Sequence, residues 1–191
     1  MNLIHIKPCK VIAFLAIILI SVIFIACSDK KDKEPDPLVG DYIFSGATFE
    51  ETVNITVGGN PQVFDPGSDA SAFVSQGLLG AAPCDDSTHT AISFRKDGTS
   101  FYICRGESNE SQLGTWIIND DRTVLTLNIS NPMPLALNIA ELNLTETVIS
   151  GTVHNFPLPL SADDPLGALI GTPPHPNFQV KQVTVEFTRI Q

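Results

Sequence analysis

The chain has 191 residues, with 11 basic and 21 acidic side chains and a formal net charge of −10. Without Lys7 and Lys10, nine basic residues against 21 acidic ones give −12, which argues against nucleic acid as a partner. The length suits one domain with one hydrophobic core.

The amino terminus has the layout of a secretory signal. Two lysines precede an uncharged apolar run, residues 11–26, and the run ends directly before Cys27. Sixteen residues are fewer than the roughly 20 that a membrane-spanning helix needs. We therefore predict a signal peptide over residues 1–26.

The four residues "FIAC" that end this segment resemble the lipobox of bacterial lipoproteins, although Phe24 stands where that family prefers leucine. The resemblance implies cleavage before Cys27, a thioether-linked diacylglycerol on its sulfur and acylation of its new amino terminus. Two or more acyl chains anchor a protein stably to a membrane. The resemblance therefore implies a lipid-anchored protein of the cell envelope, at the outer membrane. The alternative is an ordinary secretion signal followed by a chance cysteine.

The next segment, residues 27–37, is charged and contains two prolines. Such a composition buries too little apolar surface to fold, so we predict a disordered tether between the anchor and a domain at 38–191. Its acidic residues also resemble the tags that send some Bacteroidetes lipoproteins to the cell surface. The interspersed lysines depart from such tags, and a plain solvated spacer is the preferred interpretation.

Two cysteines remain for the domain, Cys84 and Cys104. In the oxidising space outside the cytoplasm, they are expected to form a disulfide. A redox-active pair is the rival interpretation, but the short C-x-x-C spacing is missing.

The clearest strand pattern lies at residues 91–104, where apolar and polar residues alternate around an Asp-Gly pair. This pair is a signal for a two-residue hairpin turn. Such a turn would pair Phe94 with Phe101 and Ile92 with Ile103, and all four side chains would share the core face.

Further segments alternate in the same way. They are residues 38–57 (one long bent strand or two short ones), 114–130 with a turn at 119–122, 135–153 with a bulge near 140–141, and 178–190. Residues 70–83 make the one plausible helix. Because sequential strands lose their edges by closing, we predict an all-β fold, an up-and-down antiparallel β-barrel of about eight strands.

The motifs "LVGDY", "ISFRKDGTSFYIC", "LGTW", "LNLTETVISG" and "FTR" follow one another across residues 38–190. In this order they resemble the lipocalin-like domain lipoproteins of Bacteroidetes, which are calycin-like barrels. The resemblance implies a small barrel and no common chemistry.

Lipocalins usually open with a Gly-x-Trp motif, and this chain has Tyr42 in the place of its tryptophan. They lay a late arginine across that aromatic residue, so Arg189 is expected to lie near Tyr42 and close one barrel end. The alternative is that Arg189 extends into solvent.

The sequence offers little for chemistry. No serine-hydrolase elbow, phosphate-binding loop or metal-ligand spacing occurs, so we predict no catalytic residue, no cofactor and no metal. His89 follows Asp85 and Asp86, but polar residues at a strand entrance explain this group. The triplet that begins at Asp86 resembles the O-glycosylation acceptor of Bacteroidetes, with Ser87 as the possible acceptor.

Residues 155–177 form an unusually long and apolar connection before the last strand. We expect it either to cover a barrel end or to act as a lid or contact loop. The apolar residues in question are Phe156, Leu158, Leu160, Leu169 and Ile170.

Two functions remain open. One is a non-catalytic binding module for a small apolar ligand, a glycan or a protein, held at the membrane by its lipid anchor. The other is a structural or accessory envelope lipoprotein whose barrel is filled by side chains, because eight-stranded barrels occur in both forms.

Overall fold

The computed structural model describes residues 36–130, 134–162 and 178–190, and the compact unit that contains the strands begins at Asp36. Its elements in chain order are β1 (Gly40–Phe49), β2 (Val53–Val57), β3 (Asn60–Phe64), helix α2 (Ser71–Leu79), the 3₁₀ turn η1 (Ser87–His89), β4 (Thr90–Phe94), β5 (Thr99–Cys104), β6 (Glu110–Ile118), β7 (Leu125–Ile129), β8 (Leu135–Leu144), β9 (Val148–Pro159) and β10 (Phe178–Arg189).

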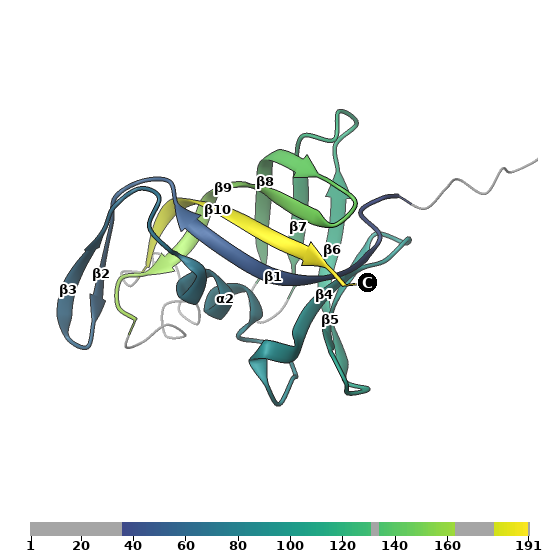
Figure 1. The fold of residues 1–191 in the computed structure, drawn as a ribbon, viewed down its shortest axis with the longest axis horizontal. Coiled ribbons are helices and arrows are strands. Elements are labelled where there is room, and N and C mark those ends of the chain that lie inside the picture. The colour runs from purple at the N-terminus through teal and green to yellow at the C-terminus, as the bar shows by residue number, and fades with distance from the viewer. Residues whose placement is uncertain (1–35, 131–133, 163–177, 191) are drawn as a thin grey trace, which may run out of the picture. The chain divides into compact units, whose positions relative to one another are not determined.

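Eight strands form a closed antiparallel barrel in the order β1-β10-β9-β8-β7-β6-β5-β4 (Figure 1). Each strand from β4 to β10 pairs with its sequence neighbour, and β1 closes the barrel between β10 and β4. This confirms the predicted eight-stranded up-and-down barrel with one short helix. The hairpin β2–β3 is a separate two-stranded sheet inserted after β1.

The hydrophobic core lies inside the barrel. Every barrel strand contributes side chains that are nearly or fully inaccessible to solvent, because alternate residues of a strand point to the same face. Representative members, one from each strand, are Tyr42, Ile92, Tyr102, Trp116, Leu127, Leu137, Val153 and Val185.

The hairpin predicted over residues 114–130 is confirmed as β6 and β7, in which Trp116 pairs with Leu127. The register of β8 against β9 shifts between Ala140 and Asn143, where Glu141 has a positive φ of 52°. This is the predicted bulge, which keeps the apolar residues on both sides of it in the core.

The predicted register of the β4–β5 hairpin is wrong by one residue. Phe94 pairs with Ser100 and Ile92 with Tyr102. The connection is longer than two residues, since the N–H of Gly98 donates to the carbonyl of Arg95 and Gly98 adopts a φ of 81°. A shift of one residue reverses the faces of a strand, so Tyr102 points inward and Phe101 outward, beneath the guanidinium of Arg95.

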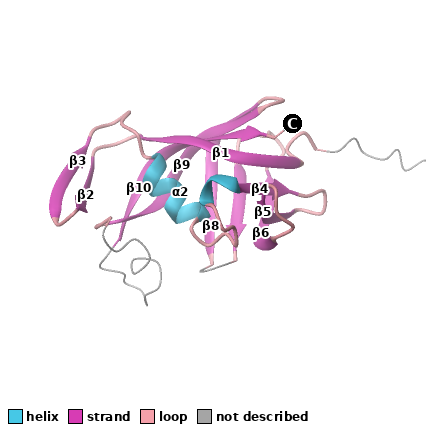
Figure 2. Cartoon of the chain, turned by 60° about the horizontal axis from the view of Figure 1, so that its bottom comes forward, coloured by secondary structure: helices cyan, strands magenta, loops and turns pink. Residues whose placement is uncertain are grey.

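Helix α2 lies across one opening of the barrel. The hydroxyl of Ser71 accepts the N–H of Ala47 on β1, the hydroxyl of Tyr102 on β5 donates to the carbonyl of Leu78 at 2.5 Å, and the ring of Phe156 on β9 packs against Gly77. These strands are not neighbours in the barrel, so α2 must bridge its rim. Figures 1 and 2 both show the helix next to β1.

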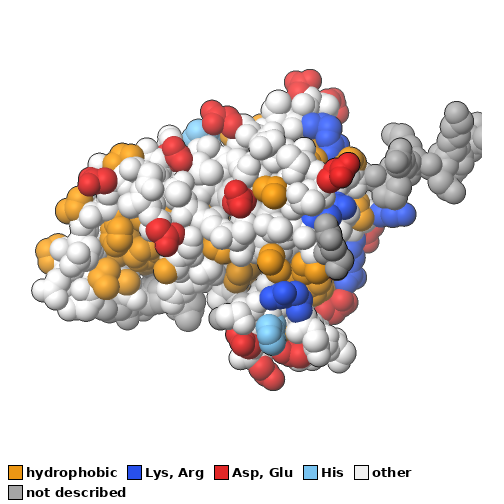
Figure 3. All heavy atoms as spheres, viewed as in Figure 1, with side chains coloured by type: hydrophobic (Ala, Val, Ile, Leu, Met, Phe, Trp, Pro, Cys, Tyr) orange, Lys and Arg blue, Asp and Glu red, His pale blue; other side chains and the backbone are white. Residues whose placement is uncertain are grey.

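The predicted long loop at 155–177 begins too early. Strand β9 continues to Pro159, and Phe156 and Leu158 are core residues with 3% and 0% exposure. They belong to the barrel wall and core, and not to a lid. Leu160 is 41% exposed and lies near the β2–β3 hairpin, where Figure 3 shows other hydrophobic side chains at the surface. Leu169 and Ile170 lie outside the described residues.

Candidate functional site

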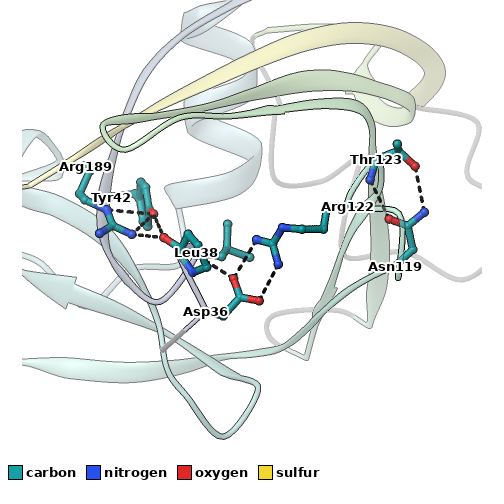
Figure 4. A network of polar contacts seen from close by, with 8 residues as sticks. Asp36, Leu38, Tyr42, Asn119, Arg122, Thr123 and Arg189 are labelled. Atoms are coloured by element: carbon teal, nitrogen blue, oxygen red, sulfur yellow. Dashed lines mark hydrogen bonds and ion pairs between the residues drawn. The ribbon is translucent and has the colours of Figure 1, made fainter. Parts of the chain in front are cut away.

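The barrel end away from α2 is closed by Tyr42 and Arg189 (Figure 4). The guanidinium carbon of Arg189 lies 5.1 Å from the centroid of the Tyr42 ring, and its nitrogens donate to the Tyr42 hydroxyl at 2.6 and 3.1 Å. The same guanidinium donates to the carbonyls of Pro37 and Val39. The contact expected from the lipocalin resemblance is therefore present.

Gly40 makes this approach possible. A Cβ atom at Gly40 would lie 3.3 Å from the guanidinium carbon of Arg189, closer than most side-chain contacts. Behind the pair, the rings of Tyr42, Phe94 and Trp116 follow one another in edge-to-face contacts, with centroids 5.7 and 5.9 Å apart. This end of the barrel is thus a packed structural plug.

The chain enters the barrel over the same end. Both carboxylate oxygens of Asp36 accept from Arg122 at 2.8 and 2.9 Å, and one of them also accepts the N–H of Leu38 (Figure 4). The Arg122 guanidinium lowers the pKa of Asp36 below its usual value. Asp36 and Pro37, assigned to the tether from sequence, are therefore held by the folded domain.

The predicted disulfide is confirmed. Cys84 and Cys104 are bonded, with their Cα atoms 5.3 Å apart. Cys104 ends β5 and Cys84 precedes η1, so the bond ties the segment after α2 to the barrel wall. The bond therefore fixes one side of the gap between β1 and β4.

The barrel wall has its shortest strand pairing between β1 and β4. Only residues 40–42 of β1 pair with residues 92–94 of β4, whereas β1 pairs with β10 from Tyr42 to Phe49. A register shift on the β10 side, between Phe44 and Gly46, marks a bulge in β1. Beyond Tyr42 on β1 and Ile92 on β4 the two strands are no longer paired. Helix α2 lies beside the opening between them.

A groove of about 580 Å³ occupies this opening. Strand β1 supplies Ile43 and Phe44, and η1, β4 and the residue after β5 supply Thr88, Thr90 and Arg105. The α2 side consists of Ala72, Ser75, Gln76, Leu79 and Gly80. The groove therefore has an apolar wall and several hydrogen-bond donors, which is the usual composition of a small-molecule site.

Two of its polar side chains stand out. The residue Thr90 is only 3% exposed, and its hydroxyl has no hydrogen-bond partner. Buried polar groups are normally paired, so an unpaired one marks a place where a partner is missing. Arg105 forms no ion pair within the described part of the chain, and its guanidinium donates to the carbonyl of Thr88 at 2.7 Å.

The sequence pattern does not predict this groove. Thr90 and Arg105 flank the predicted hairpin, but no local pattern distinguishes them from ordinary strand and turn residues. Of the residues that it did single out, Ser87 lies in η1 at the edge of this region, and Cys27 lies outside the described residues.

For residues 36–130, 134–162 and 178–190, no group of three or more His, Cys, Asp or Glu side chains is placed to hold a metal ion. In the same part of the chain, no helix is long and apolar enough to cross a membrane. Neither a family model, nor a curated protein, nor a solved structure matches this sequence.

Proposed function

We propose that this protein is a lipid-anchored binding protein of the bacterial cell envelope, whose barrel domain holds a small, largely apolar molecule without chemical conversion. The observation that supports binding is the groove between β1, β4 and α2, with its apolar wall and the unpaired hydroxyl of Thr90. A ligand there would cover apolar side chains and supply the missing hydrogen bond.

The anchor rests on the sequence. Two lysines and an apolar segment come directly before Cys27. Cys27 lies nine positions ahead of Asp36, where the folded domain begins. Lipidation at Cys27 would hold the domain at the outer membrane, as in the lipocalin-like lipoproteins of Bacteroidetes that the chain resembles. Changing Cys27 to Ser should move the protein from the membrane fraction to the soluble fraction of its host. A Cys27→Ser protein that resists carbonate washing would contradict the anchor.

The binding function can be tested with the neutral fluorescent dye N-phenyl-1-naphthylamine. Ala72 lines the groove and is itself exposed, so Ala72→Trp should fill the groove without disturbing the core. The matched control is Ala136→Trp on β8, where another exposed alanine lies outside the groove. We expect the parent and Ala136→Trp to bind the dye, and Ala72→Trp to bind it at least about tenfold more weakly. Equal binding by all three proteins would contradict the groove as the site.

The continuous core inside the barrel favours a second candidate function, that of a structural or accessory protein. Such a protein would use its surface for contacts with a glycan or a protein of the envelope and would need no small ligand. Native mass spectrometry of the domain purified from its host separates the two. A bound small molecule that Ala72→Trp excludes supports the binding module.

A further inference from the structure

We propose that the groove selects molecules that carry a carboxylate group, and that Arg105 and Thr90 recognise this group. This inference rests on the proposed binding function and specifies its ligand class. The site lies in the separation between β1 and β4, beneath α2, and not in the centre of the barrel.

No carboxylate of the described residues neutralises the charge of Arg105. Among the described basic residues, Arg95, Arg122 and Lys181 each pair with a carboxylate, and Arg189 lies against Tyr42 and two carbonyls. Arg105 has only the carbonyl of Thr88 as a side-chain partner. Its remaining N–H groups can therefore bind an anion, and a guanidinium suits a carboxylate because it can donate two parallel hydrogen bonds.

The same contact holds the guanidinium in place. The backbone N–H of Arg105 donates to the carbonyl of His89 at 2.9 Å, and its side chain returns to Thr88. Both partners belong to η1, so Arg105 is fastened to the segment that borders the groove. An arginine fixed in this way loses less conformational entropy when it binds an anion.

Asp86, the acidic residue directly before η1, already has hydrogen-bond partners. The carboxylate of Asp86 accepts the N–H and the hydroxyl of Thr88, each at 2.8 Å. It forms no ion pair with Arg105 in the described structure. Arg105 thus keeps its charge available, although the protein as a whole is strongly acidic.

Thr90 adds a second donor to the lining of the groove. It pairs across the sheet with Cys104, the residue directly before Arg105, and both Thr90 and Arg105 line the groove. A hydroxyl that is buried without a partner can donate to a carboxylate oxygen at little cost, since its desolvation has already occurred on folding. Thr90 begins β4 and Arg105 directly follows β5, and in the proposed site both donate to one carboxylate.

The rest of the lining describes the remainder of the ligand. Ile43 and Phe44 on β1 and Leu79 on α2 form an apolar wall next to these donors. Figure 3 shows hydrophobic side chains and a basic one side by side on the surface below β1. A monocarboxylate with an apolar chain matches both parts of the groove.

The test compares decanoate with decan-1-ol, which has the same chain length and no charge. Each is titrated against the domain with N-phenyl-1-naphthylamine bound, for the parent and for Arg105→Gln, Arg105→Lys and Lys96→Gln. Lys96 is exposed in the β4–β5 turn and has no ion pair in the described structure, so Lys96→Gln matches the change in net charge.

We expect the parent and Lys96→Gln to prefer decanoate by at least about tenfold. Arg105→Gln should lose this preference through weaker decanoate binding, while its binding of dye and decan-1-ol stays within about twofold of the parent. Arg105→Lys, which keeps the charge, should retain part of the preference.

Two results would overturn the inference. One is a parent protein that binds decanoate and decan-1-ol equally, and the other is an Arg105→Gln variant that keeps the preference. In both cases the dye would still bind, so the proposed binding function would stand. Failure of the parent to bind the dye at all would instead refute the binding function, and this inference with it.

Discussion

Arg189 lies over the ring of Tyr42 and donates to its hydroxyl, which joins the last strand of the barrel to the first. The two residues are also direct partners in the β1–β10 register. The guanidinium further holds the carbonyls of Pro37 and Val39, so one side chain fixes the entry of the chain, the first strand and the last strand.

Arg189→Ala should therefore lower the free energy of unfolding by about 2 kcal/mol, through the lost cation–π contact and the unpaired carbonyls. Arg189→Lys should recover little of this, because an ammonium cannot reproduce the planar fork. Urea unfolding measures both, with Lys96→Ala as the control for removal of a surface charge. A variant Arg189→Ala as stable as the parent would show that the plug is not required for closure.

The ion pair of Asp36 and Arg122 should make stability depend on pH. The pKa of Asp36 is lowered in the fold, so the pair stabilises the protein fully above the unfolded pKa of about 3.8 and loses this effect as the pH falls through the lower, folded pKa. Both side chains are about one third exposed, and we expect Arg122→Gln to cost only about 0.5–1 kcal/mol at neutral pH.

Urea unfolding of the parent and Arg122→Gln across acidic pH checks this prediction. The difference between the two proteins should be constant well above the unfolded pKa of about 3.8 and should shrink as the pH falls through the lower, folded pKa. A difference that persists unchanged into strong acid would mean that Arg122 acts by packing and not by its charge.

Thr90→Val should stabilise the domain by about 1 kcal/mol, because it replaces an unpaired buried hydroxyl with a methyl group of similar size. Thr126→Val provides the contrast, since the hydroxyl of Thr126 donates to Asn138 at 2.9 Å. Thermal unfolding without ligand compares the two. If Thr90→Val were the less stable variant, the hydroxyl would have a partner in solution, and its role in the groove would have to be reconsidered.

Loss of the disulfide should destabilise the domain strongly. Cys84 and Cys104 are 20 residues apart, and closing such a loop is worth about 3 kcal/mol in the chain-entropy description. The double variant Cys84→Ser/Cys104→Ser should lose about this amount in urea unfolding. Thiol labelling of the unfolded, unreduced parent is the independent check, and two reactive thiols would contradict the bond.

Tyr102 should titrate separately from ordinary tyrosines. Burial raises its pKa to about 12, and its hydroxyl donates to Leu78 at the end of α2. Because the unfolded tyrosine ionises near pH 10, stability should fall as the pH rises from about 10 to 12. Ultraviolet absorbance of the phenolate follows this step, and Tyr102→Phe should abolish it. A step near pH 10 from both tyrosines would show that Tyr102 is accessible to water.

Much of the barrel follows from local patterns. The alternation around Trp116 and Leu127 predicted a hairpin whose apolar residues share the core face, and the phase change in β8 indicated the bulge at Glu141. The β4–β5 register was missed, because the Asp-Gly pair suggested a two-residue turn while the Arg95 carbonyl accepts the N–H of Gly98 in a longer one. That one-residue difference exchanged Phe101 for Tyr102 in the core.

The class of fold and the Cys84–Cys104 bond could be predicted from the chain alone, because the first depends on residue period and the second on which cysteines remain for the domain. The contact of Arg189 with Tyr42 was expected only from the lipocalin resemblance. The groove could not be predicted, because it depends on contacts between distant elements. It exists because β1 leaves β4 after Tyr42 and Ile92, and because α2 is held over the gap by contacts to β1, β5 and β9. Thr90 is unpaired only in that setting, since its burial depends on elements distant from it in the chain.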